Sequence, residues 1–377
     1  MTLDPDVLLA GPRGRGLLVH LFDDVAIRTL RMRADSAAGL GASSMLYMSA
    51  SVTPGVRGLV DRVRTGRHRV HAEREMRRPV VPAEMAQAIV AAPLPSVSPA
   101  ALVEALGRTV DDAKPWQPSD GNEAVLASAE VRAALTALAE RVAETAFARA
   151  WAAPAQPEQW VLDRKDDRLG SEPIPAPAAA LAAWREAVEA EERAAVKRRE
   201  KGQSYGGPWW SNPPGYLTHS TSAWREFGPV GLYLEEDSFG PMAADATPVG
   251  APPEKTYEIT GAVAWARLCR EYPLDVTATR EVLWNHSVGH SDVWVIPDWQ
   301  AMAADWDAVH LTIAGYLAAA TTRIDVSDGR ASAIAGWGPD ETVWLRDAPA
   351  PTSAVVEWRR FQSVGWRMQM TPMEEEA

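Results

Sequence analysis

A short segment of the sequence, residues 218–227, combines hydroxyl, imidazole, guanidinium and aromatic side chains. Four of its residues, and one that follows shortly after, are the candidate ligand contacts: His219, Thr221, Trp224, Arg225 and Tyr233. Sites for flat, phosphate-bearing ligands use this mixture, because an aromatic face stacks on the ring while arginine and hydroxyl groups bind the anion. A serine- and threonine-rich turn, whose hydroxyls cap the local backbone, explains the same residues without a ligand.

A carboxylate near the start of a late predicted strand, Glu341, is the candidate catalytic residue. A carboxylate so placed can stabilise a developing oxocarbenium ion or act as a general base. A solvated glutamate beside the turn at residues 338–340 is the alternative interpretation. Two further acidic clusters, at residues 235–237 and 305–307, could supply paired carboxylates for acid–base chemistry, although runs of acids are usually solvated faces.

Two other motifs could support different chemistry, and the first gives a third option, a metal-dependent hydrolase. His286, His290 and Asp292 have a spacing that would suit a metal-dependent hydrolase on a helix, but Gly289 favours a loop, so no metal site is predicted. The glycine-rich segment 11–16 lacks the ending of a phosphate-binding loop. It is predicted to be a turn between a first helix and a strand near residues 17–22, and its two arginines leave an anion-binding option open.

Composition narrows the class of protein. The 377 residues carry a formal net charge of −12, which argues against a nucleic-acid-binding protein. The one cysteine, Cys269, excludes an internal disulfide and a cysteine-based zinc site, and fits a reducing compartment. No basic segment followed by an apolar run opens the chain, and no stretch approaches the roughly 20 apolar residues of a membrane helix, so we expect a cytoplasmic protein that is not membrane-bound.

The apolar patterns predict an α+β fold with two unlike halves. Apolar residues spaced by three and four, with alanine between them, predict a mainly helical domain over residues 1–150. Prolines and then a highly charged helix indicate a linker over 151–201. Residues 202–377 hold twelve of the 16 tryptophans and are predicted to form a Trp-rich α+β domain with a small mixed or antiparallel sheet and short helices.

Individual elements can be predicted in the Trp-rich half. Strands are expected over residues 230–235, 292–297, 308–313, 332–337 and 341–345, and helices over residues 260–270 and from Asp298, a helix cap, to Trp306. The strand over 308–313 places His310 and Thr312 on one face.

Two functional hypotheses from different classes follow. The first is a nucleotide- or dinucleotide-utilising transferase of the ADP-ribosyl or glycosyl-transfer type, in which His219, Thr221 and Arg225 hold the ligand and Glu341 stabilises the cation. The second is a noncatalytic interaction or regulatory protein that recognises a protein partner through exposed aromatic residues at 205–233. The residues identify no cofactor. A deep pocket lined by the polar candidates would favour the enzyme, and a flat apolar patch would favour the interaction protein.

Overall fold

A computed structural model describes residues 3–37, 79–117, 121–164, 175–203, 207–236, 243–361 and 365–368. The N-terminal region is helical in these ranges, as the sequence predicts. Its helices are α1 (Pro5–Ala10), α2 (Pro12–His20), α3 (Val25–Ala37), α7 (Pro82–Ala91), α8 (Pro99–Asp111), α9 (Gly121–Leu126), α10 (Ala129–Ala143) and α11 (Ala146–Arg149). Side-chain caps define where several begin: Ser98 accepts a hydrogen bond from the backbone of Ala101 in α8, and Ser128 does the same for Val131 in α10.

The first glycine-rich segment is a helix, so the prediction of a turn followed by a strand near residues 17–22 was wrong. Gly11 is the N-cap of α2 and Pro12 occupies its first turn, where a missing N–H costs nothing. Gly11 also lies so close to α16 (Ile313–Ala319) that a Cβ there would sit 2.4 Å from the carbonyl oxygen of Leu317. This glycine therefore serves close packing between the helical region and the C-terminal half.

Two main sheets make up the rest of the fold. The first has the order β14-β13-β5-β1-β2-β12-β9-β6 among the described residues, and all its pairs are antiparallel except β6 with β9. Its strands are β1 (Gln159–Arg164), β2 (Thr218–Thr221), β5 (Ala243–Val249), β6 (Thr256–Ile259), β9 (Ala308–Leu311), β12 (Glu341–Trp344), β13 (Val356–Phe361) and β14 (Gly365–Met368). The second sheet, of order β10-β11-β8-β7, is also mixed. Its strands are β7 (Pro273–Asp275), β8 (Val293–Pro297), β10 (Ile324–Ser327) and β11 (Arg330–Ser332).

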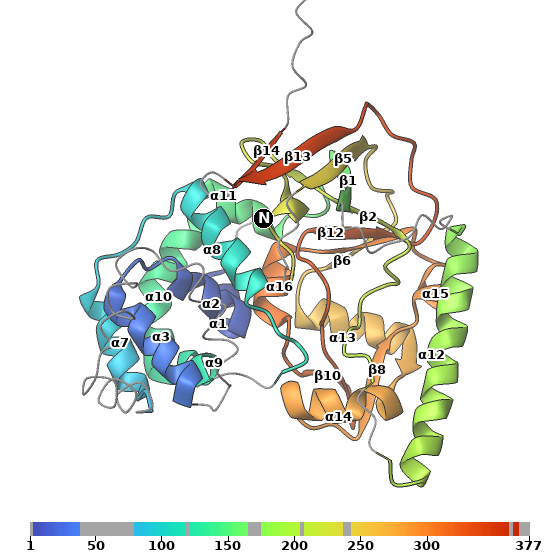
Figure 1. The fold of residues 1–377 in the computed structure, drawn as a ribbon, viewed down its shortest axis with the longest axis horizontal. Helices are drawn as coiled ribbons and strands as arrows, with labels where there is room; N and C mark the ends of the chain where they lie inside the picture. The colour runs from blue at the N-terminus through green and yellow to red at the C-terminus, as the bar shows by residue number, and fades with distance from the viewer. Residues whose placement is uncertain are drawn as a thin grey trace, which may run out of the picture.

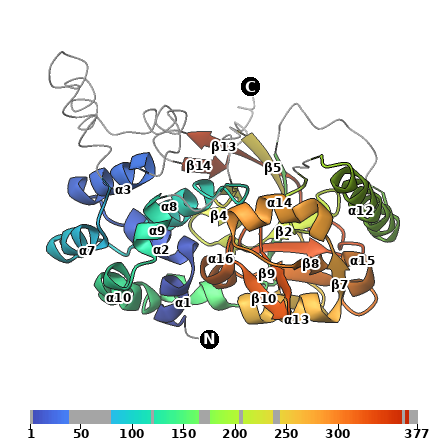
Figure 2. The same ribbon diagram turned by 90° about the horizontal axis from the view of Figure 1, so that it is seen from below.

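Helices of the C-terminal half pack around these sheets. They are α12 (Pro177–Glu200), α13 (Ala262–Glu271), α14 (Thr277–Ser287), α15 (Trp299–Met302) and α16. Figures 1 and 2 show the N-terminal helices gathered on one side of the molecule and α12 on the opposite side, with the sheets between them. The sequence prediction of an α+β fold is confirmed.

One hydrophobic cluster runs from the N-terminal helices into the C-terminal half, joining residues such as Leu8 and Leu17 to Tyr316 and Leu317. Within it, Trp265, Trp299 and Trp337 are fully buried and stack edge-on or tilted, with ring centres 5.7–6.1 Å apart. A second cluster centres on Trp284 and Trp294. The division into domains at residues 150 and 201 stays a prediction.

Several local predictions need correction. The proline-rich stretch assigned to a linker contains β1, which lies inside the first sheet between β2 and β5. Residues 230–235, predicted as a strand, begin with a 3-10 helix over Val230–Leu232. Of the strand predicted over 332–337, only Ser332 lies in a strand, β11, and Ile334 forms an isolated bridge with Ala320, before Gly336 turns left-handed with φ of 72°. The other strands, the helix over 260–270 and the Asp298 cap are confirmed within a few residues, although the Asp298-capped helix ends at Met302.

None of the helices in the described ranges combines the length and apolarity that a membrane-spanning helix needs.

Candidate functional site

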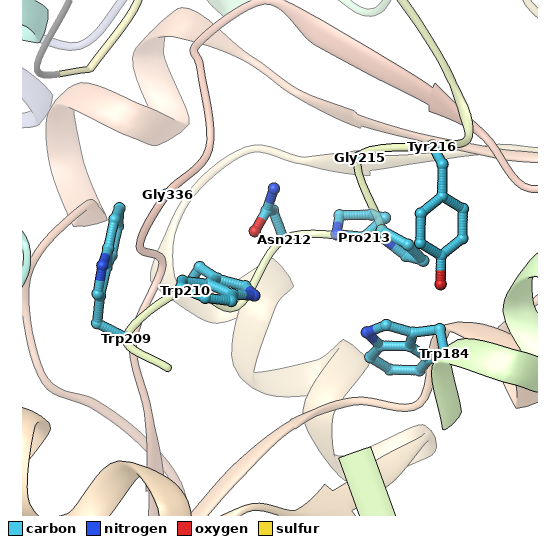
Figure 3. A pocket seen from close by; sticks show the side chains of 9 residues that line it. Trp184, Trp209, Trp210, Asn212, Pro213, Gly215, Tyr216 and Gly336 are labelled. Atoms are coloured by element: carbon cyan, nitrogen blue, oxygen red, sulfur yellow. The ribbon is translucent and has the colours of Figure 1, made fainter. Parts of the chain in front are cut away.

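A pocket of about 420 Å³ lies between α12 and the irregular segment 207–216 (Figure 3). Its walls carry three indole rings, a phenol ring and an amide, and none of the lining residues within the described ranges is charged. The lining residues are Trp184, Trp209, Trp210, Asn212, Pro213, Pro214, Gly215, Tyr216 and Gly336. Such a volume and a largely aromatic lining suit a cleft that holds a small molecule, and this cleft is open, since Trp210 and Tyr216 stay well exposed.

Hydrogen bonds to the main chain hold one wall of this pocket in place. Buried Arg280 donates to the carbonyl oxygen of Trp210 at 3.1 Å, and the indole of Trp284 donates to that of Trp209 at 2.8 Å. The backbone N–H of Ser211 donates to the carbonyl of Ala335 at 2.9 Å. Three successive residues are thus fixed from α14 and the segment after β11, so this wall exists before any ligand arrives.

Gly336 completes the wall because no other residue fits there. Its φ of 72° is left-handed, and an added Cβ would lie 2.7 Å from the Cβ of Trp210. On the opposite side, the hydroxyl of Tyr216 donates to the carbonyl of Ala180 in α12 at 3.3 Å, beside Trp184 of the same helix. Figure 3 shows Trp184 and Tyr216 on one side of the hollow and Trp209 and Trp210 on the other.

The structure brings His219, Thr221 and Glu341 together on one face of the first sheet. Strands β2 and β12 pair so that Glu341 lies opposite Thr221, and alternation puts His219 on the same face. Nδ1 of His219 lies 2.8 Å from Oε1 of Glu341, and Nε2 lies 3.2 Å from the carbonyl oxygen of Pro214, a pocket-lining residue. Both partners are oxygen acceptors, so this geometry suits an imidazole protonated at both nitrogens.

Thr221 is bound to the turn that precedes β12. Its hydroxyl donates to Oδ2 of Asp340 at 2.9 Å, and the same oxygen accepts from the backbone and hydroxyl of Ser222. The hydroxyl oxygen of Thr221 also accepts from the N–H of Gly231 at 3.0 Å. With its hydroxyl group thus engaged, Thr221 fixes the start of β12, and with it the position of Glu341.

A second carboxyl group, that of Glu236, is bonded to the backbone of pocket-lining Gly336, although Glu236 itself is not among the lining residues that the structure describes. Its Oε1 accepts from the hydroxyl of Tyr316 at 2.8 Å and its Oε2 accepts from the N–H of pocket-lining Gly336 at 3.1 Å. Burial of this carboxyl, with a smaller effect of the negative charge of Glu341, raises the pKa of Glu236 to about 7, although both hydrogen bonds and the charge of Arg13 oppose the shift. A carboxyl group with such a pKa can give or take a proton near neutral pH.

The remaining predicted contacts lie elsewhere. Trp224 of β3 (Ala223–Trp224) packs against Phe147, with ring centres 5.2 Å apart, and against Tyr233, whose hydroxyl donates to the carbonyl of Phe227 at 2.9 Å. Arg225 is exposed. These side chains are absent from the lining of the Trp184–Tyr216 pocket as far as the structure describes it, and their role as ligand contacts stays a prediction.

A second hollow, of about 440 Å³, lies next to this aromatic group. It is lined by Ala100, Glu226, Phe227, Trp358, Trp366, Arg367 and Met368. The hydrogen bonds of the His219–Glu341 pair and of Glu236 reach the lining of the first pocket, and within the described ranges no such group is bonded to the lining of this second hollow. The second hollow therefore offers fewer groups for acid–base chemistry than the first pocket.

The acidic cluster at 235–237 was recognised from the sequence, but Glu236 was not separated from its neighbours, and Asp237 lies outside the described residues. Trp209 and Trp210 belong to the aromatic residues at 205–233 of the interaction hypothesis, whereas Trp184 belongs to none of the predicted sites. The useful signal was the sequence Trp209-Trp210-Ser211-Asn212-Pro213-Pro214, which joins large rings to prolines that fix the backbone.

The histidine cluster near residue 290 gives no sign of a metal centre. His290 and Asp292 are largely exposed and 3.6 Å apart, and His286 is exposed. No group of three or more metal-ligating side chains comes together among the residues that the structure describes.

No protein-family model matches this chain, and comparisons with curated proteins and with solved structures give no significant match.

Proposed function

We propose that this protein is an enzyme that transfers a glycosyl-type group from a nucleotide or dinucleotide, with its site at the aromatic pocket and the adjoining His219, Glu236 and Glu341. The observation that carries the proposal is that hydrogen bonds join His219 and Glu236 to two residues of the pocket lining. Pro214 lines the pocket and bonds His219, while Gly336 lines it and bonds Glu236. Glu236 is thus bonded directly to a lining residue, and Glu341 is joined to another one through His219.

The two carboxyl groups are in different environments, as an acid and a carboxylate must be for this reaction. Glu341 is partly exposed and bonded to the imidazole of His219, whereas the carboxyl of Glu236 is enclosed by Tyr316 and the main chain at Gly336. Protonated Glu236 donates its proton to the leaving group as the bond to the anomeric carbon breaks. Glu341 stabilises the oxocarbenium ion and takes the proton of the attacking hydroxyl group.

His219 is a positioning residue in this scheme. It holds one oxygen of Glu341 and is itself held by the Pro214 carbonyl, so it couples the orientation of the carboxylate to the pocket wall. The ligand-stacking role is assigned to Trp184, Trp209, Trp210 and Tyr216, which line the pocket, and no role in this scheme requires Trp224 or Tyr233.

The test is release of the free base from a panel of purine and pyridine nucleotides and dinucleotides, followed by chromatography. We expect Glu341→Gln and Glu236→Gln each to lower turnover by about 10²- to 10⁴-fold. Glu130→Gln, an exposed change on α10, serves as the matched control and should leave turnover unchanged. The wild-type rate should fall as pH rises above about 7, and equal rates for all three variants would contradict the assignment.

A second candidate is a noncatalytic protein that binds a proline-rich peptide. It is favoured by the exposure of Trp210 and Tyr216, which stay 45% and 43% exposed at the pocket mouth, because aromatic-lined grooves bind polyproline segments. A proline-rich peptide that binds with an affinity unaffected by Glu341→Gln, together with no base release from any nucleotide, would favour this candidate over the enzyme.

A further inference from the structure

Asn212 stands out among the pocket residues because no hydrogen bond joins its side chain to any residue that the structure describes. Its Oδ1 is buried and has no partner. Buried polar atoms in folded proteins are nearly always hydrogen-bonded, and an exception calls for an explanation such as a ligand. The residues around it are firmly held, since Ser211 is bonded to Ala335 and Pro213 follows directly.

The surroundings of this amide define what could bind it. Among the lining residues that the structure describes, none is charged, so the part of a ligand that lies against them is expected to be uncharged. The indole rings of Trp184, Trp209 and Trp210 offer flat faces for stacking, so the enclosed part is planar. Asn212 offers a donor and an acceptor side by side. Its Oδ1 is covered in this structure, and since no hydrogen bond fixes the amide, the amide can rotate and turn this oxygen toward the pocket.

We propose that Asn212 reads the edge of an adenine-type base stacked in the Trp184–Tyr216 pocket. An asparagine amide forms two hydrogen bonds with such a base, because its oxygen accepts from the exocyclic amino group and its nitrogen donates to the neighbouring ring nitrogen. Guanine presents two acceptors on the same edge and leaves the amide oxygen unpaired. This inference rests on the proposed function in that it names the base of the nucleotide, and Asn212 is its specificity-determining residue.

The test measures binding, by tryptophan fluorescence and calorimetry, of adenosine, guanosine, purine riboside, which lacks the amino group, and 7-deazaadenosine, which lacks the ring acceptor. Adenosine should bind the wild-type protein about tenfold more tightly than each of the other three. Asn212→Ala should bind all four with equal, weak affinity. Asn212→Asp keeps the acceptor and loses the donor, so it should still prefer adenosine over purine riboside but no longer over 7-deazaadenosine.

Control variants separate a lost contact from a disturbed fold. Trp210→Ala should weaken all four probes alike, and Phe361→Ala, a change at an exposed aromatic residue outside the pocket lining, should weaken none. The proposal is overturned if guanosine or purine riboside binds the wild-type protein as tightly as adenosine, if no nucleoside binds at millimolar concentration, or if Asn212→Ala keeps the preference for adenosine.

Failure of this proposal can be told apart from failure of the proposed transfer reaction. Selective adenosine binding that depends on Asn212, with no base release from any nucleotide, would support the recognition and contradict the chemistry. Base release that depends on Glu341, without a preference for adenine among the probes, would support the transfer chemistry and contradict the adenine recognition.

Discussion

The two faces of the first sheet carry the same chemical pair in opposite settings. On one face His219 bonds Glu341 at 2.8 Å, and the two side chains are 21% and 27% exposed. On the other face His310 of β9 bonds Glu258 of the adjacent β6 at 2.6 Å, and the histidine is only 2% exposed. The residue types are alike, and the two glutamates are similarly exposed, at 27% and 24%. Burial of the histidine therefore separates a pair that can meet a ligand from one that holds strands together.

The buried pair belongs to a wider polar network. Nε2 of His310 lies 3.7 Å from Oδ1 of Asp340, and Oε1 of Glu258 accepts from the N–H of Ala155. Asp340 in turn binds Thr221 on β2. The buried histidine therefore ties β6, β9 and the turn before β12 to one another, and so supports the strand that presents Glu341.

The largest expected effect on stability comes from removing the buried histidine, His310. His310→Ala should lower the free energy of unfolding at pH 7 by about 3–5 kcal/mol, because Glu258 and Asp340 lose their common cation in a poorly solvated place. Urea denaturation followed by fluorescence measures this change. His290→Ala, at a largely exposed histidine, should change it by less than about 0.5 kcal/mol. A loss below about 1 kcal/mol for His310→Ala would show that the network does not hold the strands.

The pH dependence of stability gives a somewhat smaller effect at the same residue. Burial alone would lower the pKa of His310, but Asp340 and Glu258 outweigh it and raise the pKa to about 9. The folded pKa lies above the unfolded value near 6.5, so the stabilisation is complete below pH 6.5 and is lost as pH rises through 9. The expected loss is on the order of 3 kcal/mol.

Urea midpoints between pH 7 and 9 test this prediction. Glu236, with its pKa raised to about 7, contributes mainly below that window. His310→Gln should flatten the profile between pH 7 and 9, whereas an unchanged slope in that variant would assign the pH dependence to another group.

A glycine in the pocket wall gives the next smaller effect. Gly336→Ala places a Cβ 2.7 Å from that of Trp210 and forces a left-handed backbone on alanine, so we expect it to cost about 1–3 kcal/mol of stability. It should also weaken nucleoside binding, since Trp210 must move. Gly215→Ala is the matched control, because Gly215 lines the same pocket with nothing within 4 Å of its Cβ position. Equal effects of the two changes would mean that the wall is not preformed.

The sequence predicted the parts of this molecule that local patterns determine. Helical spacing of apolar residues predicted the N-terminal helices, and a highly charged run predicted α12. Short apolar runs predicted β8, β9 and β12. The approach of His219 to Glu341 could not be derived in this way, because 122 residues separate them and only the pairing of β2 with β12 brings them together.

The elements that the sequence did not predict also depend on contacts between residues far apart in the chain. β1 was hidden in a proline-rich stretch since its place between β2 and β5 depends on partners far along the chain. The predicted strand over 332–337 gives way to an irregular segment that packs at Gly336 against Trp209 and Trp210, more than 100 residues earlier. Local patterns contain none of these contacts, and the pocket is built from them.

The smallest expected effect on stability is at the partly exposed pair. His219→Ala should lower the free energy of unfolding by about 1 kcal/mol or less, because water can replace the imidazole at both Glu341 and the Pro214 carbonyl. Its effect on base release should nevertheless be clear, since Glu341 loses the group that orients it, and His219→Gln, which keeps one donor, should restore part of the rate. A stability loss as large as that of His310→Ala, with no change in turnover, would mean that both pairs are structural and that exposure does not distinguish them.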